Sequence, residues 1–231
     1  MGLHHSHSHG PAPADTPGGD KRLVFAIAVN VLLTVAQIIG GVLSGSLALV
    51  ADAIHNLSDA AALAIALIAR RIARHPADAK HTYGHGRAEM IAAVFNLAWL
   101  IFIGIFLVVE AVERFFNPQP IAGWTVVIIA AIALAVDIAT VMLTYRMSKT
   151  SMNIRAAFIH NLSDAMASVG VIVAGTLIIL YDWLFVDALV TIVIAAYILG
   201  HAAIEIPKAI HILMQGVPAG LDIADVTAAL Q

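Results

Sequence analysis

Six apolar stretches of about 20 residues or more divide this 231-residue chain and limit what it can fold into. An α-helix rises about 1.5 Å per residue, so about 20 residues cross the roughly 30 Å of hydrocarbon in a bilayer. Charged residues make up 12% of the chain, against roughly 25% in a soluble domain. The sequence therefore predicts an all-α, polytopic membrane protein with six transmembrane helices. We expect them at residues 23–43, 47–69, 90–112, 124–145, 156–180 and 184–204.

The basic residues predict the orientation of these helices. All of the 12 Lys and Arg residues except Arg114 lie before the first span, after the last, or in the loops that follow spans two and four. Because basic loops stay in the cytoplasm, both termini are expected there. We expect a disordered His-rich tail over residues 1–20, the transmembrane transport domain over 21–208, and the start of a truncated cytoplasmic segment over 209–231.

One six-residue motif, His-Asn-Leu-Ser-Asp-Ala, occurs in both span two and span five. It places a histidine and an aspartate four residues apart, on one face of a helix: His55 with Asp59, and His160 with Asp164. All four residues are expected near the bilayer midplane, where buried carboxylates are costly unless a cation compensates them. Two neutral imidazoles and two carboxylates balance a divalent cation, and four N and O donors suit tetrahedral Zn²⁺.

Other interpretations of the motif stay open. The four residues could instead form hydrogen bonds between helices, although two matching pairs at midplane favour an ion site. Ligand type leaves Co²⁺, Cd²⁺, Fe²⁺ and Mn²⁺ possible, and the absence of cysteine excludes a thiolate site. Four further polar residues in the predicted spans are candidates for lining an ion cavity, with helix capping or structural pairing as the alternative: Asn30, Gln37, Asp52 and Asp137.

The twin motifs, the six spans and the loop motif from Ala77 to Glu89 together resemble the cation diffusion facilitator family, in its bacterial zinc and cobalt-zinc-cadmium efflux branch. The resemblance implies a proton-coupled antiporter of the inner membrane, not an enzyme. It implies a homodimer in the lipid bilayer, with no nucleic acid among its partners. The transport site would be formed by His55, Asp59, His160 and Asp164, with Zn²⁺ as substrate and protons as counter-substrate.

The same resemblance implies a second, peripheral metal site on the loop after span two, formed by Asp78, His81 and His85. Three N and O donors at this spacing could also converge on a metal by themselves, whereas solvated histidines beside a glycine turn are the alternative. The family usually continues into a cytoplasmic ferredoxin-like domain, which is expected to be missing or truncated here. Two rival functions stay open: a membrane-embedded zinc metalloenzyme and a metal sensor that does not transport.

Overall fold

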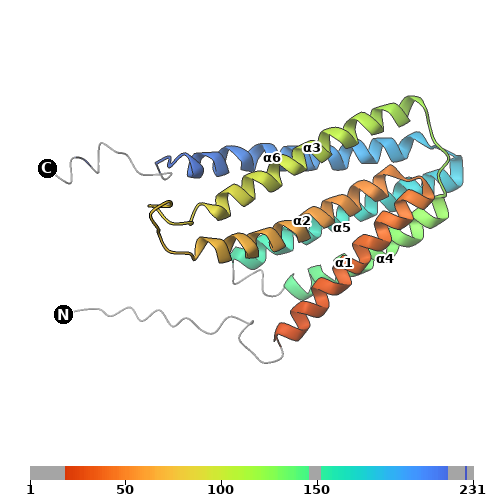
Figure 1. Cartoon of the computed structure of the whole chain (residues 1–231). Coiled ribbons are helices and arrows are strands. Elements are labelled where there is room, and N and C mark those ends of the chain that lie inside the picture. Colours follow the sequence, from red (N-terminus) through yellow and green to blue (C-terminus); the bar gives the residue numbers. More distant parts are fainter. Residues whose placement is uncertain (1–18, 146–151, 218–226, 228–231) are drawn as a thin grey trace.

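Six helices make up nearly all of the regular structure in the computed structural model, which describes residues 19–145, 152–217 and 227. Five of the six predicted spans lie wholly within one helix each, and the sixth, 184–204, begins one residue before its helix. The helices begin and end beyond several predicted spans, because an α-helix continues past the hydrocarbon into polar sequence that hydropathy does not detect. Their bounds are α1 Gly19–Ser44, α2 Leu47–Ala73, α3 Ala88–Phe116, α4 Gly123–Tyr145, α5 Met152–Tyr181 and α6 Phe185–Leu213 (Figure 1).

Four of these helices are long and apolar enough to cross a membrane by themselves. Within the described residues they are α3, α6, the part of α4 from Gly123 to Met142 and the part of α5 from Phe158 to Tyr181. The helix α1 contributes a shorter apolar segment, Val31–Ser44, and α2 carries charged residues along its length. The chain is therefore a helical membrane protein.

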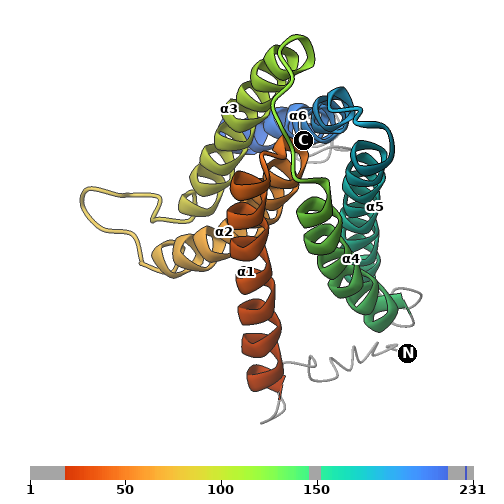
Figure 2. The same cartoon turned by 90° about the vertical axis from the view of Figure 1, so that its right-hand side faces the viewer.

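The helix α2 lies at the centre of the bundle. It contacts α1, α3, α5 and α6, while α3 packs along α6 and α4 packs along α5 (Figures 1 and 2). Ala48, Ala51 and Ala53 of α2 are fully buried in these contacts. Small side chains let neighbouring helices approach closely, which is how transmembrane helices pack without a hydrophobic driving force between them. The copy of the six-residue motif on α2 therefore lies in the middle of the bundle.

The first turn of α2 is capped from two directions. The Ser46 hydroxyl accepts a hydrogen bond from the Leu49 N–H at 3.1 Å, as an N-cap serine should. The Asp187 carboxylate of α6 accepts hydrogen bonds from the Ser46 hydroxyl, from the Leu47 N–H at 2.7 Å and from the Ala48 N–H at 3.3 Å. Because helix N-terminal N–H groups carry partial positive charge, a buried carboxylate there is stabilising. The cap joins α2 to α6 at this end of the bundle.

The turn between α1 and α2 requires glycine at position 45. Gly45 has a φ of 76°, and a Cβ placed there would lie 2.6 Å from the Pro120 carbonyl oxygen. Its own carbonyl oxygen accepts a hydrogen bond from the Arg114 guanidinium at 2.7 Å. The turn therefore requires glycine for two reasons: the positive φ at position 45 and the close approach of the Pro120 carbonyl oxygen.

We expect Gly45→Ala to destabilise the folded protein by about 1–3 kcal/mol, since alanine adds both left-handed strain and a steric clash. The measurement is thermal unfolding of the purified protein in detergent. Gly200→Ala is the matched control, because a Cβ at Gly200 in α6 meets no other atom within 4 Å. Equal melting temperatures for both variants would contradict the proposed role of Gly45.

Candidate metal centre

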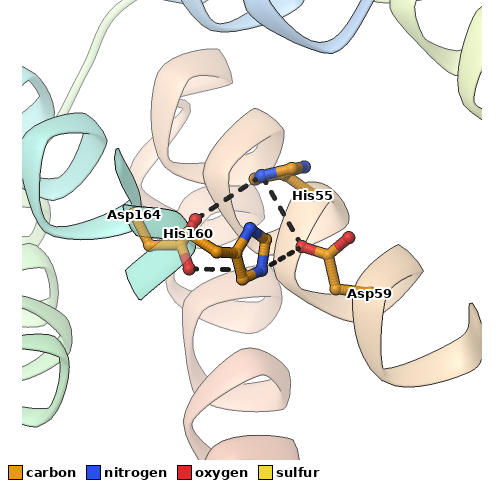
Figure 3. Close-up of side chains that lie close together, drawn as sticks. All are labelled: His55, Asp59, His160 and Asp164. Atoms are coloured by element: carbon orange, nitrogen blue, oxygen red, sulfur yellow. Dashed lines mark ion pairs between the residues drawn. The ribbon is translucent and has the colours of Figure 1, made fainter. Parts of the chain in front are cut away.

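The structure brings the two H-x-x-x-D pairs together from α2 and α5. His55 and Asp59 project from α2, His160 and Asp164 from α5, and one ligand atom from each lies within 4.8 Å of all the others (Figure 3). The one-turn spacing within each helix puts both side chains of a pair on the same face. We call these four residues the central cluster.

Each histidine in the central cluster faces both aspartates. The Nε2 atom of His55 lies 3.6 Å from an Asp59 oxygen and 3.5 Å from an Asp164 oxygen. The Nε2 atom of His160 lies 3.3 Å from an Asp59 oxygen and 3.6 Å from an Asp164 oxygen. Donors held about 2.0–2.1 Å from a tetrahedral zinc ion lie roughly 3.3 Å from one another. The four N–O separations therefore suit a small tetrahedral cation.

Burial leaves several of these atoms without partners. His55 Nδ1, His55 Nε2, Asp59 Oδ2 and Asp164 Oδ1 are buried and have no hydrogen-bond partner in the described part of the chain. Unpaired buried polar atoms are costly, and few occur in native structures. A cation at the centre of the cluster would pair the atoms that face it, and the two carboxylates would balance its charge.

Two cavities meet the central cluster from different sides. A cavity of about 630 Å³ contains Asp59 and His160 together with Glu89, Asn96 and Glu205, from the end of the bundle where the 74–87 loop lies. A second cavity of about 470 Å³, between α5 and α6, contains His55, Asp164 and Tyr197. The side chains of Asp59 and His160 are correspondingly more exposed than those of His55 and Asp164. The cluster is therefore reached mainly from the loop end.

Several residues around the cluster were not among the sequence-predicted site residues. The Tyr197 ring lies edge-on against His55, with 5.8 Å between ring centres. No sequence signal points to Tyr197, because its position depends on how α6 packs. Glu89 could have been found, since it is the last residue of the loop motif and an acidic residue at the start of a helix.

Three of the four candidates for cavity lining lie away from the cavities that contain the central cluster. Gln37 Nε2 donates a hydrogen bond to Asp52 at 2.7 Å, and Ser168 donates one to Asp137 at 3.0 Å. Gln37, Asp52 and Asp137 are not part of the two cavities that contain the central cluster. Asp52 does not cap α2, since Ser46 and Asp187 do. The side chain of Asn30 lies outside the described residues.

The loop between α2 and α3 forms a second group of possible ligands. One atom from each of Asp78, His81 and His85 lies within 4.8 Å of the others. The Asp78 carboxylate accepts hydrogen bonds from the backbone N–H groups of His81 at 2.6 Å and Lys80 at 2.7 Å. The His81 and His85 rings lie 4.3 Å apart, and His75, which the sequence did not single out, packs its ring 5.9 Å from His85. We call Asp78, His81 and His85 the loop cluster.

Hydrogen bonds make the Asp78 carboxylate easier to ionise. The backbone N–H of His81, followed by that of Lys80 and the His81 side chain, holds the pKa of Asp78 below its ordinary value. A carboxyl group whose pKa is lower in the folded loop than in the unfolded chain stabilises the folded loop at any pH above its unfolded pKa. This stabilisation is lost as the pH falls through the pKa of the folded loop. Asp78 therefore stays available as an anionic ligand at lower pH than an isolated aspartate.

This shift leads to a prediction for the loop. We expect the carboxyl carbon of Asp78, followed by NMR in detergent micelles, to titrate below the ordinary aspartate pKa of 3.8. A titration of Asp78 at or above this ordinary pKa would show that the loop hydrogen bonds do not persist in solution.

Replacing the loop histidines with alanine (His81→Ala with His85→Ala) should lower the zinc bound per chain at neutral pH while leaving binding to the central cluster intact.

Comparison with known proteins adds an independent line of evidence. The family model of the cation efflux transmembrane domain matches residues 23–214. The zinc transporter ZitB of Pectobacterium atrosepticum is 39% identical over 95% of this chain and 67% of its own length. The metal cation efflux system protein CzcD of Cupriavidus metallidurans is 35% identical over 98% of this chain and 70% of its own. The cadmium, cobalt and zinc/H(+)-K(+) antiporter of Bacillus subtilis is 36% identical, with coverage of 98% and 71%.

These matches confirm the resemblance inferred from the sequence. The matched region begins in α1 and ends just after α6, so it includes every helix that forms the central cluster and its cavities. The family is one of membrane transporters, which supports the expectation that the chain is not an enzyme. The chain therefore belongs to the cation efflux family, the cation diffusion facilitators.

Proposed function

We propose that this protein exports Zn²⁺ across the bacterial inner membrane in exchange for protons, by alternating access around the central cluster. The observation that carries the proposal is the convergence of His55, Asp59, His160 and Asp164, with N–O separations of 3.3–3.6 Å. Zinc is also the metal in the name of the zinc transporter ZitB, and the name of the Bacillus antiporter includes zinc, cadmium and cobalt. We extend the range of substrates to Co²⁺ and Cd²⁺ because N and O donors accept them too.

In this proposal all six helices cross the membrane, including α1 and α2. Polar residues inside a span are tolerated when they face the interior of a bundle, and the central position of α2 supports such a placement. The excess of basic residues at one end assigns that end, with both termini, to the cytoplasm. The cavity that holds Asp59 and His160 then opens toward the cytoplasm.

Alternating access follows from this asymmetry. In the described conformation Asp59 and His160 line the cytoplasmic cavity, so Zn²⁺ enters past Glu89 and Glu205 and displaces protons from its ligands. Carboxylates along an entrance raise the local concentration of cations. Rocking of α1, α2, α4 and α5, as the family resemblance implies, would then expose the cluster to the outside, where protons replace the metal.

We also propose a homodimer, as the family resemblance implies. The helix α3 carries exposed aromatic residues along its length, among them Phe95, Trp99 and Phe102, which suit contact with lipid or with a second copy. Native mass spectrometry in detergent would test this proposal directly. A monomer at all concentrations would rule it out without affecting the transport proposal.

The experiment that tests the function uses the full chain reconstituted in liposomes. A pH gradient is imposed across the liposome membrane, and zinc movement is followed with a fluorescent indicator inside. We expect zinc to accumulate against its concentration gradient, and a protonophore to abolish the accumulation by collapsing the pH gradient. Folded protein that binds zinc but moves none, or moves it regardless of the pH gradient, would contradict proton-coupled transport.

A further inference from the structure

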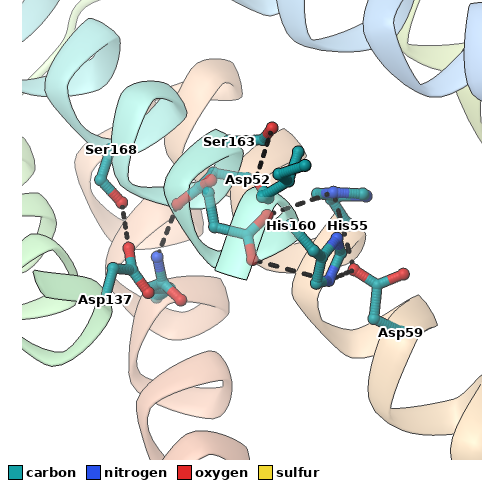
Figure 4. Close-up of polar contacts among 10 residues, drawn as sticks. Asp52, His55, Asp59, Asp137, His160, Ser163 and Ser168 are labelled. Atoms are coloured by element: carbon teal, nitrogen blue, oxygen red, sulfur yellow. Dashed lines mark hydrogen bonds and ion pairs between the residues drawn. The ribbon is translucent and has the colours of Figure 1, made fainter. Parts of the chain in front are cut away.

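A buried pair beside the central cluster joins α1 to α2. The Gln37 amide nitrogen donates a hydrogen bond to Asp52 Oδ2 at 2.7 Å. Both side chains are sealed from solvent, with 0% of Gln37 and 1% of Asp52 exposed. Asp52 lies on α2 three residues before His55, so it is close to the cluster without belonging to it (Figure 4).

One atom of each partner in this pair remains unsatisfied. The Gln37 carbonyl oxygen Oε1 and the Asp52 oxygen Oδ1 are buried and have no hydrogen-bond partner in the part of the chain that the structure describes. Both atoms are acceptors when the carboxylate is ionised, so neither can pair with the other. Leaving these two buried acceptors unpaired is unfavourable, because each has lost its hydrogen bonds to water.

A single added proton would satisfy both atoms. A carboxylic acid and a primary amide can share two hydrogen bonds, one from the amide N–H and one from the acid O–H. The first of these, from Gln37 Nε2 to Asp52 Oδ2, is already present. With a proton on Oδ1, the Asp52 O–H could donate to Gln37 Oε1 and complete the ring.

The described groups that act electrostatically on Asp52 include no permanent cation. They are Asp137 of α4, Asp164 of α5 and His55 of α2, of which His55 is a cation only when protonated, and Gln37 of α1 faces Asp52 as a neutral group. Asp137 in turn accepts its hydrogen bond from the Ser168 hydroxyl. An isolated buried carboxylate is unfavourable without a positive partner. A proton on Asp52 itself, a protonated His55 or a metal in the cluster can fill that role.

We propose that Gln37 and Asp52 form a proton-binding site, and that a divalent metal in the central cluster displaces this proton. The inference rests on the proposed antiport and specifies where one of its protons is held. When the metal binds, its positive charge compensates the Asp52 carboxylate. The Asp52 O–H bond then breaks, its electron pair stays on the carboxylate, and the proton passes to cytoplasmic water. Metal and proton thus compete electrostatically, because each compensates the Asp52 carboxylate, although they bind to different residues.

The test counts protons released when zinc binds. Purified protein in weakly buffered detergent solution is titrated with ZnCl₂ at pH 7, and a pH indicator reports the protons released per zinc bound. Asp52→Asn keeps the hydrogen bond to Gln37 but cannot carry the proton. We expect it to bind zinc in the same stoichiometry as the wild type and to release about one proton fewer.

Ser168→Ala is the matched control, because it removes another buried polar contact between helices near the cluster. It should release as many protons as the wild type. If D52N also releases the wild-type number, the inference is overturned while proton-coupled transport stands. If the wild type releases no protons on binding zinc, the coupling in the proposed function fails as well.

A second measurement covers the case in which D52N does not fold. Infrared difference spectra of the wild type, with and without zinc, report protonated carboxyl groups through their C=O stretch. We expect zinc binding to remove one such band, and Asp52→Ser, which retains a hydroxyl partner for Gln37, to lack it. Spectra in which zinc removes no protonated carboxyl band would overturn the inference without any variant.

Discussion

Replacing Asp164 with asparagine is expected to abolish zinc transport driven by a pH gradient. The Asp164 carboxylate faces both histidines of the central cluster, and Asp164 Oδ1 is among the buried atoms without a partner. Asparagine has the same shape but removes one of the two negative charges that balance a divalent cation. We expect zinc affinity at the cluster to fall at least about 100-fold, or roughly 2.7 kcal/mol.

The measurement compares zinc uptake into liposomes and zinc binding in detergent for D164N and the parent protein. Asp59→Asn should behave alike, because Asp59 faces the same two histidines. Asp182→Asn is the matched control: Asp182 lies in the turn before α6 with a φ of 57°, a conformation that asparagine tolerates. Transport by D164N at the parental rate would show that the metal passes elsewhere.

The largest effect on stability is expected from Asp187→Ala. This change leaves the Ser46 hydroxyl and the first N–H groups of α2 without their acceptor in a site where Asp187 is only 1% exposed. Loss of a cap and burial of unpaired donors together should cost roughly 3 kcal/mol. The measurement is thermal unfolding in detergent, followed by size-exclusion chromatography of the heated protein.

Two further variants make this prediction specific. Asp187→Asn keeps one oxygen acceptor and should lie between the parent and D187A in melting temperature. Asp182→Asn, five residues earlier and exposed, should melt as the parent does. If D187A unfolds at the parental temperature, the start of α2 must be held by other contacts, and the cap from α6 contributes little.

The helices and the twin motif could be predicted because both depend on local spacing. Apolar runs of membrane-spanning length predicted all six helices, and the i, i+4 spacing predicted which side chains share a face. Antiparallel helices bring opposite ends of the two motifs to one level, and in the structure His55 Nε2 lies 3.5 Å from an Asp164 oxygen.

Contacts that depend on tertiary packing could not be predicted from the sequence. Asp187 lies 141 positions after Ser46, and nothing in the local sequence indicates that it caps α2. Asp52 was a candidate for capping or for lining a cavity, yet it pairs with Gln37 of α1. The partner of Asp52 depends on which face α1 presents to α2. Asn30 and Gln37 lie seven residues apart on α1, and this spacing does not determine that face. Tyr197 could not be predicted from the sequence either, because its position beside His55 depends on helix packing.

The two cavities divide the central cluster into equivalent halves. One contains Asp59 and His160, and the other contains His55 and Asp164. An ion arriving from either side therefore meets one imidazole and one carboxylate first. The ligand pair met on the two approaches is of the same kind, so the ligands themselves give transport no direction. In the proposed antiporter, direction comes from the proton gradient alone, and reversing that gradient would make the same protein load zinc into the cell.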